Sequence, residues 1–160
     1  MLPLKKIVCP TDFSEPSMEA LDVACEYAQH FDAELKVLHV IPFSPVFAST
    51  IEASAALNYL PSDEERRAQA QGQITNLIEE RVPKDVRIVT ELRMGDAPTE
   101  ITSVAAEDNA DLIVIGTHGE TGWRFLAIGS VASKVVRMAH RPVLTTYGGP
   151  LPENAERSAK

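Results

Sequence analysis

Two patterns of hydrophobic residues alternate along this chain. Short apolar runs, rich in residues that favour extended structure, predict five strands, at Lys5–Val8, Glu34–Val40, Val86–Leu92, Leu112–Ile115 and Pro142–Tyr147. Between these runs, apolar residues recur every three or four positions, which is the spacing of one helix face. This spacing predicts about four helices: one contains Met18, Leu21, Cys25 and Ala28, two span Ser62–Arg81 and Ala97–Glu107, and the last contains Val131, Val135 and Met138.

Two of the predicted helices begin with residues that stabilise a helix N-terminus. Ser14 is suited to cap the first helix, and Pro16 fits its first turn. Ser62 is suited to cap the long helix, whose first residues, Asp63–Glu65, place acidic side chains at the positive end of the helix dipole. The stretch Pro42–Pro61 shows neither periodicity, and we expect it to be irregular.

The alternation of strands and helices favours a parallel sheet. Neighbouring parallel strands must be joined by crossovers of about a dozen residues or more, and here these crossovers are the helices. Right-handed crossovers with helices on both faces give a doubly wound α/β fold. We therefore predict a single α/β domain over residues 1–147, followed by a polar and disordered tail at residues 148–160.

The composition excludes several functional classes. The chain carries 23 acidic and 15 basic residues, a net charge of −8, so it gains nothing from counterion release and no nucleic-acid partner is expected. No apolar run approaches the roughly 18 residues that cross a membrane, and Met1–Lys6 lacks the apolar core of a signal peptide. We expect a cytoplasmic protein in which Cys9 and Cys25 are small buried hydrophobic residues rather than disulfide or metal ligands.

The segment most informative about function is the glycine-rich loop from Gly116 to Gly129. It follows an apolar strand and precedes a helix that begins near Ser130. Glycines let backbone N–H groups turn inward around an anion, the helix N-terminus adds donors, and the Ser130 hydroxyl can donate to a phosphate oxygen. The same glycines would also suit a loop that merely connects a strand to a helix. The sequence has no Walker loop, no Gly-x-Gly-x-x-Gly fingerprint and no Gly-x-Ser-x-Gly elbow.

The spacing within this loop resembles that of one protein family. Two residues separate Gly116 from Gly119, and nine more lead to Gly129 and Ser130. This pattern is similar to the nucleotide loop of ATP-binding universal stress proteins. Three further segments resemble the same family in the same order: its first strand and turn at Ile7–Ser14, the end of its second strand at Leu38–Ile41, and the entry to its last strand at His140–Val143.

The resemblance, which extends over about residues 4–147, implies the strand order 3-2-1-4-5, ATP binding and homodimers. In that order the chain reverses direction across the sheet between strands 1 and 4, where open α/β sheets bind their ligands. Asp12 follows the end of strand 1 and Gly116 follows the end of strand 4, so both are expected at this crevice. The implied nucleotide-binding residues are Pro10, Thr11, Asp12, Val40, Gly116, Thr117, His118, Gly119, Gly129, Ser130 and Val131.

The roles of individual residues leave alternatives open. The resemblance implies that Asp12 accepts hydrogen bonds from ribose or helps hold a cation, and that Val40 offers its backbone to adenine. The ligand would be ATP with Mg²⁺ or Mn²⁺ bound through the phosphates. Aspartate after a strand also commonly forms an Asx turn or caps a helix. His118 and Arg124 either contact phosphate or are solvated, and Trp123 is more typical of packing than of stacking on a base.

Binding ATP does not by itself imply hydrolysing it. Fast phosphoryl transfer needs a charge clamp and metal-holding acids, whereas Asp12 is the only obvious acid expected near the crevice. We therefore expect an ATP-responsive binding module with at most slow hydrolysis. A slow ATPase or self-phosphorylating enzyme, and a scaffold for AMP, a cyclic nucleotide or another ligand, stay open as alternatives. The histidines on separate elements, which lack metal-ligand spacing, are interpreted as structural: His30, His39 and His140.

The last predicted strand is the expected homodimer interface. In the implied order it lies at a sheet edge, and the run Pro142–Tyr147 carries no charge that would discourage a second strand from pairing. Dimers of the resembled family form here, through the segment that corresponds to Val143–Thr146. Thr145 and Thr146 are less apolar than the residues common at the end of this strand in the family. Alternatively, residues 148–160 fold over the edge and keep the chain monomeric.

Overall fold

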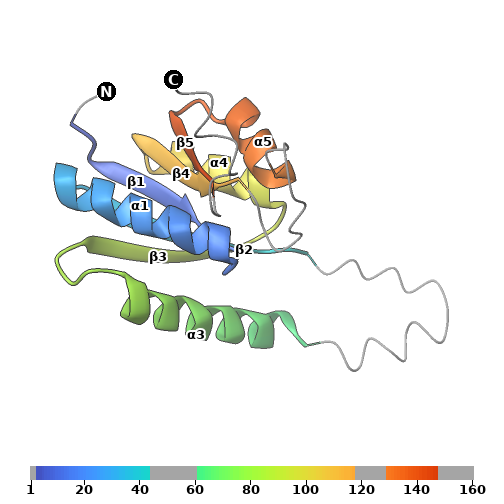
Figure 1. Cartoon of the computed structure of the whole chain (residues 1–160). Coiled ribbons are helices and arrows are strands. Elements are labelled where there is room, and N and C mark those ends of the chain that lie inside the picture. The colour runs from blue at the N-terminus through green and yellow to red at the C-terminus, as the bar shows by residue number, and fades with distance from the viewer. Residues whose placement is uncertain (1–2, 44–60, 118–128, 148–160) are drawn as a thin grey trace, which may run out of the picture.

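A computed structural model describes residues 3–43, 61–117 and 129–147. These residues form one five-stranded parallel sheet with the order β3-β2-β1-β4-β5, as predicted (Figure 1). The strands are β1 (Lys6–Pro10), β2 (Glu34–Ile41), β3 (Arg87–Met94), β4 (Leu112–Gly116) and β5 (Val143–Thr146). The helices of the described part are α1 (Glu15–Phe31), α3 (Asp63–Arg81), α4 (Ala97–Glu107) and α5 (Ser130–Met138).

Helices cover both faces of the sheet (Figure 1). Because side chains alternate along a strand, the central strands send successive residues into two separate cores. On the first face, α1 and α3 pack over a core that includes Ile7, Cys9, Leu35, Val37 and Val114. On the second face, α4 and α5 pack over Val8, Leu38, Ile113 and Ile115. None of the described helices has the length and apolarity needed to cross a membrane.

The predicted helix starts are confirmed, although only one cap works as expected. The Ser62 side chain accepts from the Glu65 N–H at 3.2 Å while the Glu65 carboxylate accepts from the Ser62 N–H at 2.7 Å, a complete capping box. Ser14 is the N-cap residue of α1 and Pro16 lies in the first turn, as predicted. The Ser14 side chain makes no capping bond, however, and its hydroxyl donates to the Asp12 carboxylate.

The first strand runs two residues further than the predicted Lys5–Val8 and ends at Pro10. Main-chain groups of successive strand residues point to alternate neighbours. The Thr11 N–H donates to the Leu38 carbonyl at 2.8 Å, so odd-numbered residues of β1 face β2 and Pro10 faces β4. Proline has no N–H, and the pairing of β1 with β4 ends at Val8–Ile113. Proline therefore ends one ladder while β1 stays paired with β2 beyond it.

Both cysteines are buried, as the sequence predicts, at opposite sides of the contact between β1 and α1. Burial, reinforced by the nearby Asp22 carboxylate, raises the pKa of Cys25 to about 11. Burial, with the neighbouring Cys25 and Asp22 charges adding to it, also raises the pKa of Cys9. Neither thiol is poised to ionise near neutral pH.

We predict that a thiol-specific reagent such as Ellman's reagent modifies the folded protein far more slowly than the unfolded chain. A pKa of about 11 instead of 9.0 lowers the thiolate fraction of Cys25 about 100-fold at pH 8, and Cys9 is shielded further. The measurement compares reaction rates with and without denaturant, the unfolded chain serving as the control. Rapid modification of either thiol in the folded protein would contradict this burial.

Candidate functional site

A cavity of about 320 Å³ opens at the carboxyl ends of the central strands. It lies where β1 and β4 separate, which is the switch point of a doubly wound sheet. Residues at or after the ends of three strands line it together with residues near the N-termini of three helices, α1, α4 and α5. They are Pro10, Thr11, Asp12, Ser17, Leu38, Val40, Ala97, Ile101, Ile115, Gly116, Thr117, Gly129, Ser130, Val131 and Ala132.

The walls of this cavity differ in polarity. The residues from β2 and α4 are apolar: Leu38, Val40, Ala97 and Ile101. The residues that follow β1 and β4 and those that begin α5 bring hydroxyl groups, one carboxylate and main-chain polar groups. Such a cavity suits a ligand with a flat apolar part and a polar or anionic part.

The N-terminus of α5 faces the cavity without a side-chain cap. Its N-cap residue is Gly129, whereas α4 is capped by Asp96, whose carboxylate accepts from the Thr99 N–H at 3.3 Å. The N–H groups of the first turn, from Ser130 to Ala132, therefore lack a capping acceptor within the described residues. The cavity wall thus carries free donors at the positive end of a helix dipole.

The two ends of the glycine-rich loop lie side by side. The Gly129 N–H donates to the Thr117 carbonyl, and the Thr117 N–H and hydroxyl both donate to the Thr146 carbonyl, at 2.9 and 3.0 Å. The loop therefore starts and ends at the same place, the carboxyl ends of β4 and β5. The predicted site residues His118 and Gly119, like Trp123 and Arg124, lie outside the described residues.

Gly116 lets the start of α1 approach the end of β4. A Cβ atom at this position would lie 2.6 Å from the Pro16 carbonyl oxygen and 3.3 Å from the Ser17 nitrogen. Both are main-chain atoms, so they cannot move aside as a flexible side chain would. Glycine is therefore needed here for close backbone packing that shapes the floor of the cavity.

The side-chain hydroxyl of Thr11 is held by two hydrogen bonds. Its hydroxyl accepts from the Phe13 N–H at 3.0 Å and lies 3.0 Å from the Ser17 hydroxyl. Ser17 uses its own proton to donate to the Ser14 carbonyl at 2.8 Å, so Thr11 must be the donor to Ser17. Thr11 lines the cavity, but its hydroxyl serves to orient the backbone of the turn that follows β1.

Asp12 forms the Asx turn and also borders the cavity. Its Oδ1 atom accepts from the Ser14 N–H at 3.1 Å and from the Ser14 hydroxyl, which is the Asx turn of the structural interpretation. Its Oδ2 atom has no hydrogen-bond partner among the described residues, and the side chain borders the cavity. One carboxylate oxygen therefore fixes the turn, and the other is available to a ligand.

No group of three or more His, Cys, Asp or Glu side chains within residues 3–43, 61–117 and 129–147 is placed to hold a metal ion. Asp12 is the single carboxylate among the lining residues. Within the described part of the chain, Asp12 is therefore the one carboxylate that a cation in this cavity would meet.

The model of the universal stress protein family matches residues 3–146. The chain belongs to the universal stress protein family. Among curated members, it is 40% identical over 140 residues to universal stress protein MJ0531 of Methanocaldococcus jannaschii, a match that covers 88% of this chain and 80% of that protein.

Solved structures of the family share the fold of this universal stress protein. Protein MJ0577 of the same organism aligns with a TM-score of 0.68 and 25% identity, over 92% of this chain and 99% of its own. A universal stress protein in complex with cAMP aligns with a TM-score of 0.60 and 22% identity, over 91% and 98% of the chains. One from Archaeoglobus fulgidus in complex with dAMP gives 0.56 and 22%, with the same coverage.

Apart from His118 and Gly119, every site residue predicted from the sequence lines the cavity. The sequence reasoning missed six lining residues: Ser17, Leu38, Ala97, Ile101, Ile115 and Ala132. Five of them are apolar or small residues with the spacing of core positions, and periodicity does not distinguish a core position from a cavity wall. For Ala97 and Ile101, the sequence holds one signal: their four-residue spacing puts both side chains on the same face of a helix.

We predict that Gly116→Ala destabilises the domain by about 1–3 kcal/mol, because the new methyl group overlaps main-chain atoms of α1. Gly72→Ala is the matched control. Gly72 lies in α3 with nothing within 4 Å of its added Cβ, so alanine should stabilise by about 0.5–1 kcal/mol. Urea unfolding measures both. Equal effects of the two substitutions would show that the approach of α1 to Gly116 does not constrain the fold.

Proposed function

We propose that this universal stress protein binds ATP in the cavity between β1 and β4, with Mg²⁺ or Mn²⁺ held through the phosphates. The observation that carries the proposal is the uncapped N-terminus of α5, which opens onto the same cavity as an apolar wall. Free N–H donors at a helix N-terminus are a general site for phosphate, and the apolar wall suits a base.

Each part of the nucleotide has a matching surface in this proposal. The phosphates would accept from the N–H groups of Ser130, Val131 and Ala132 and from the Ser130 hydroxyl. The base would lie against the apolar residues of β2 and α4, next to the Val40 backbone. The ribose hydroxyls would donate to Asp12 Oδ2, which is left free by the Asx turn. The phosphate-bound cation would use Asp12 at most as an additional ligand.

The solved relatives support an adenine nucleotide as the ligand class, since two of them hold cAMP and dAMP. The choice of ATP rests on the loop spacing Gly116-x₂-Gly119-x₉-Gly129-Ser130, which resembles that of ATP-binding members. We also propose a cytoplasmic location, because both thiols are unpaired, as is usual in a reducing compartment.

We propose a binding module rather than a fast enzyme. The described lining residues include no lysine or arginine, and a single acid. Phosphoryl transfer depends on positive groups and metal-holding acids around the γ-phosphate. The bound nucleotide would then act mainly by changing the protein's conformation or partners, with hydrolysis slow at most.

For ATP, we predict that Ser130→Ala lowers the binding free energy by about 1.5–3 kcal/mol, as for a hydrogen bond to a charged group. Ser133→Ala, one turn later on α5 and away from the cavity lining, is the matched control and should bind like the wild type. Calorimetric titrations with Mg–ATP, AMP and cAMP measure the affinities. Wild-type protein that binds AMP or cAMP more tightly than ATP would favour the scaffold interpretation, and equal losses in the two serine variants would contradict the site.

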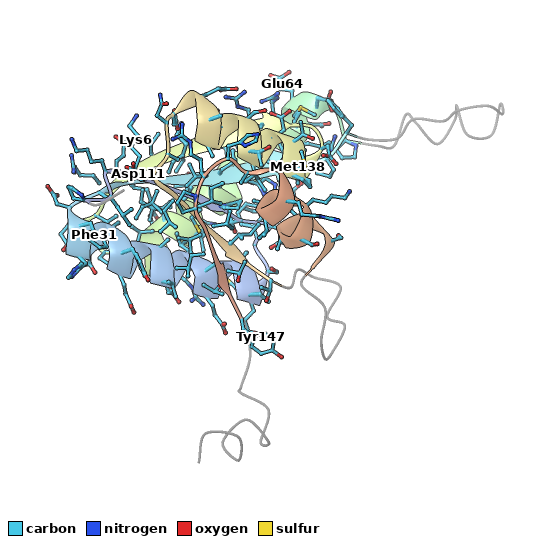
Figure 2. All side chains as sticks on the ribbon, turned by 90° about the horizontal axis from the view of Figure 1, so that it is seen from above. Lys6, Phe31, Glu64, Asp111, Met138 and Tyr147 are labelled. Carbon is cyan, nitrogen blue, oxygen red and sulfur yellow. The ribbon has the colours of Figure 1, made fainter. Side chains whose placement is uncertain are left out.

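We further propose a homodimer that forms by pairing of two β5 strands. The two edge strands of the sheet are β3 and β5 (Figure 1). They differ in charge. The β3 edge carries Arg87, Glu91 and Arg93, whereas β5 carries no charge along Val143–Thr146. Charged edges resist pairing with another chain, and uncharged edges permit it. Tyr147, which projects from the end of β5 and is 52% exposed, would extend the contact (Figure 2).

The hydrogen bonds of β5 define which main-chain groups such a partner strand would meet. The Pro142 and Thr146 carbonyls accept from the Ile113 and Thr117 N–H groups at 3.0 and 2.9 Å, so even-numbered residues of β5 face β4. The N–H and C=O of Thr145 therefore point to the open edge. A substitution at this residue can block edge pairing without removing a bond to β4.

We predict that Thr145→Pro converts the dimer into a monomer while the domain stays folded. Thr90→Pro on β3 is the matched control. The Gly95 N–H donates to the Ile41 carbonyl, so odd-numbered residues of β3 face β2, and the main-chain groups of Thr90 point to the open edge. That variant removes an equivalent donor from the opposite edge and should remain dimeric. Light scattering gives the mass and circular dichroism the fold. A monomeric wild type, or a dimer of unchanged affinity in Thr145→Pro, would place the interface elsewhere or exclude it.

A further inference from the structure

His39 lies one residue from two cavity-lining residues but faces the other way. Leu38 and Val40 send their side chains to the second face of the sheet, where they line the cavity. The alternation along β2 therefore turns the His39 ring to the first face, toward the turn that follows β1. This histidine has no place in the nucleotide contacts described above.

The His39 ring is bonded to the backbone of that turn. Its Nδ1 atom lies 2.8 Å from the Thr11 carbonyl oxygen. A carbonyl can only accept, so Nδ1 must carry a proton. The Thr11 N–H already donates to Leu38, and the Thr11 hydroxyl bonds with Phe13 and Ser17. With His39 on the carbonyl, every polar group of Thr11 is fixed.

The same ring also packs against the far side of the turn. The centroids of the His39 and Phe13 rings are 4.5 Å apart, with an interplanar angle of 37°. Phe13 has a φ of 65°, in the left-handed region that a bulky residue seldom adopts. Residues in such conformations persist only where their surroundings hold them. His39 thus holds the residue before Asp12 by a hydrogen bond and the residue after it by ring packing.

We propose that His39 is a positioning residue for the nucleotide site: it fixes the turn Thr11–Asp12–Phe13 and so keeps the free Asp12 oxygen at the cavity. The inference rests on the proposed nucleotide binding. Asp12 is exposed, and among the described residues its carboxylate bonds only to Ser14, two residues further along, so its direction depends on how the backbone of the turn is held.

Two kinds of variant separate the contributions of the ring and the hydrogen bond. His39→Asn keeps an N–H donor near the position of Nδ1 but loses the ring, and His39→Phe keeps a ring for Phe13 but loses the donor. We expect His39→Ala to weaken Mg–ATP binding at least tenfold, with both other variants intermediate. His30→Ala is the matched control, because His30 also packs against a phenylalanine, Phe31, at the other end of α1.

A second cycle tests whether His39 acts through Asp12. Asp12→Asn keeps an oxygen that can accept from the Ser14 N–H but replaces the free carboxylate oxygen with an amide. In the Asp12→Asn background, His39→Ala should change the ATP affinity by less than about twofold, since the group that it positions is gone. A role in general stability would instead weaken binding by the same factor in both backgrounds.

Nitrogen-15 NMR of the unliganded protein supplies a readout independent of ATP. His39 should show a proton bound to Nδ1, as its bond to Thr11 requires. Wild-type protein that binds no adenine nucleotide would overturn the proposed function and this inference together. Wild-type binding with unchanged affinity in folded His39→Ala, an unprotonated Nδ1, or failure of all three His39 variants to fold would overturn the inference alone.

Discussion

The site depends on where β1 stops pairing with each of its two neighbours. Beyond Val8 the strand is no longer paired with β4, while the Thr11 N–H still bonds to Leu38 in β2. Pro10 supports this asymmetry, because its missing N–H falls on the side that faces β4. A residue with an N–H at this position could extend the ladder and draw the two strands together where the cavity now opens. Pro10 thus contributes to a gap that the strand order already places between β1 and β4.

The elements around that gap are packed so that few polar groups are left over. Thr11 uses its N–H, its carbonyl and its hydroxyl to hold the turn, and Thr117 ties the end of β4 to β5. Among the described residues, the groups that stay available include the first N–H donors of α5, the Ser130 hydroxyl and one oxygen of Asp12. The described lining therefore places polar groups at the start of α5 and after β1, opposite the apolar side chains of β2 and α4.

The fold was largely predictable from sequence because its signals are local. The apolar runs of β2 and β4, the periodicity of α4 and the capping box at Ser62 each depend on residues close together in the chain. The end of β1 was placed two residues too early, because whether a strand stays paired at a proline depends on which neighbour the proline faces. Ala97, Ile101 and Ile115 were missed because cavity walls and core positions share one periodicity. The contacts of His39 with Thr11 and Phe13 join segments 28 and 26 residues apart, so no local pattern could have revealed them.

The bond between Gly129 and Thr117 has a consequence for how this fold can vary. Because this bond joins residue 117 to residue 129, it ties the end of β4 to the start of α5 directly. Lengthening a flexible connection between two such fixed ends costs only about 0.6 kcal/mol for each doubling of its length. The number and identity of residues between Thr117 and Gly129 can therefore change while β4 and α5 keep their register.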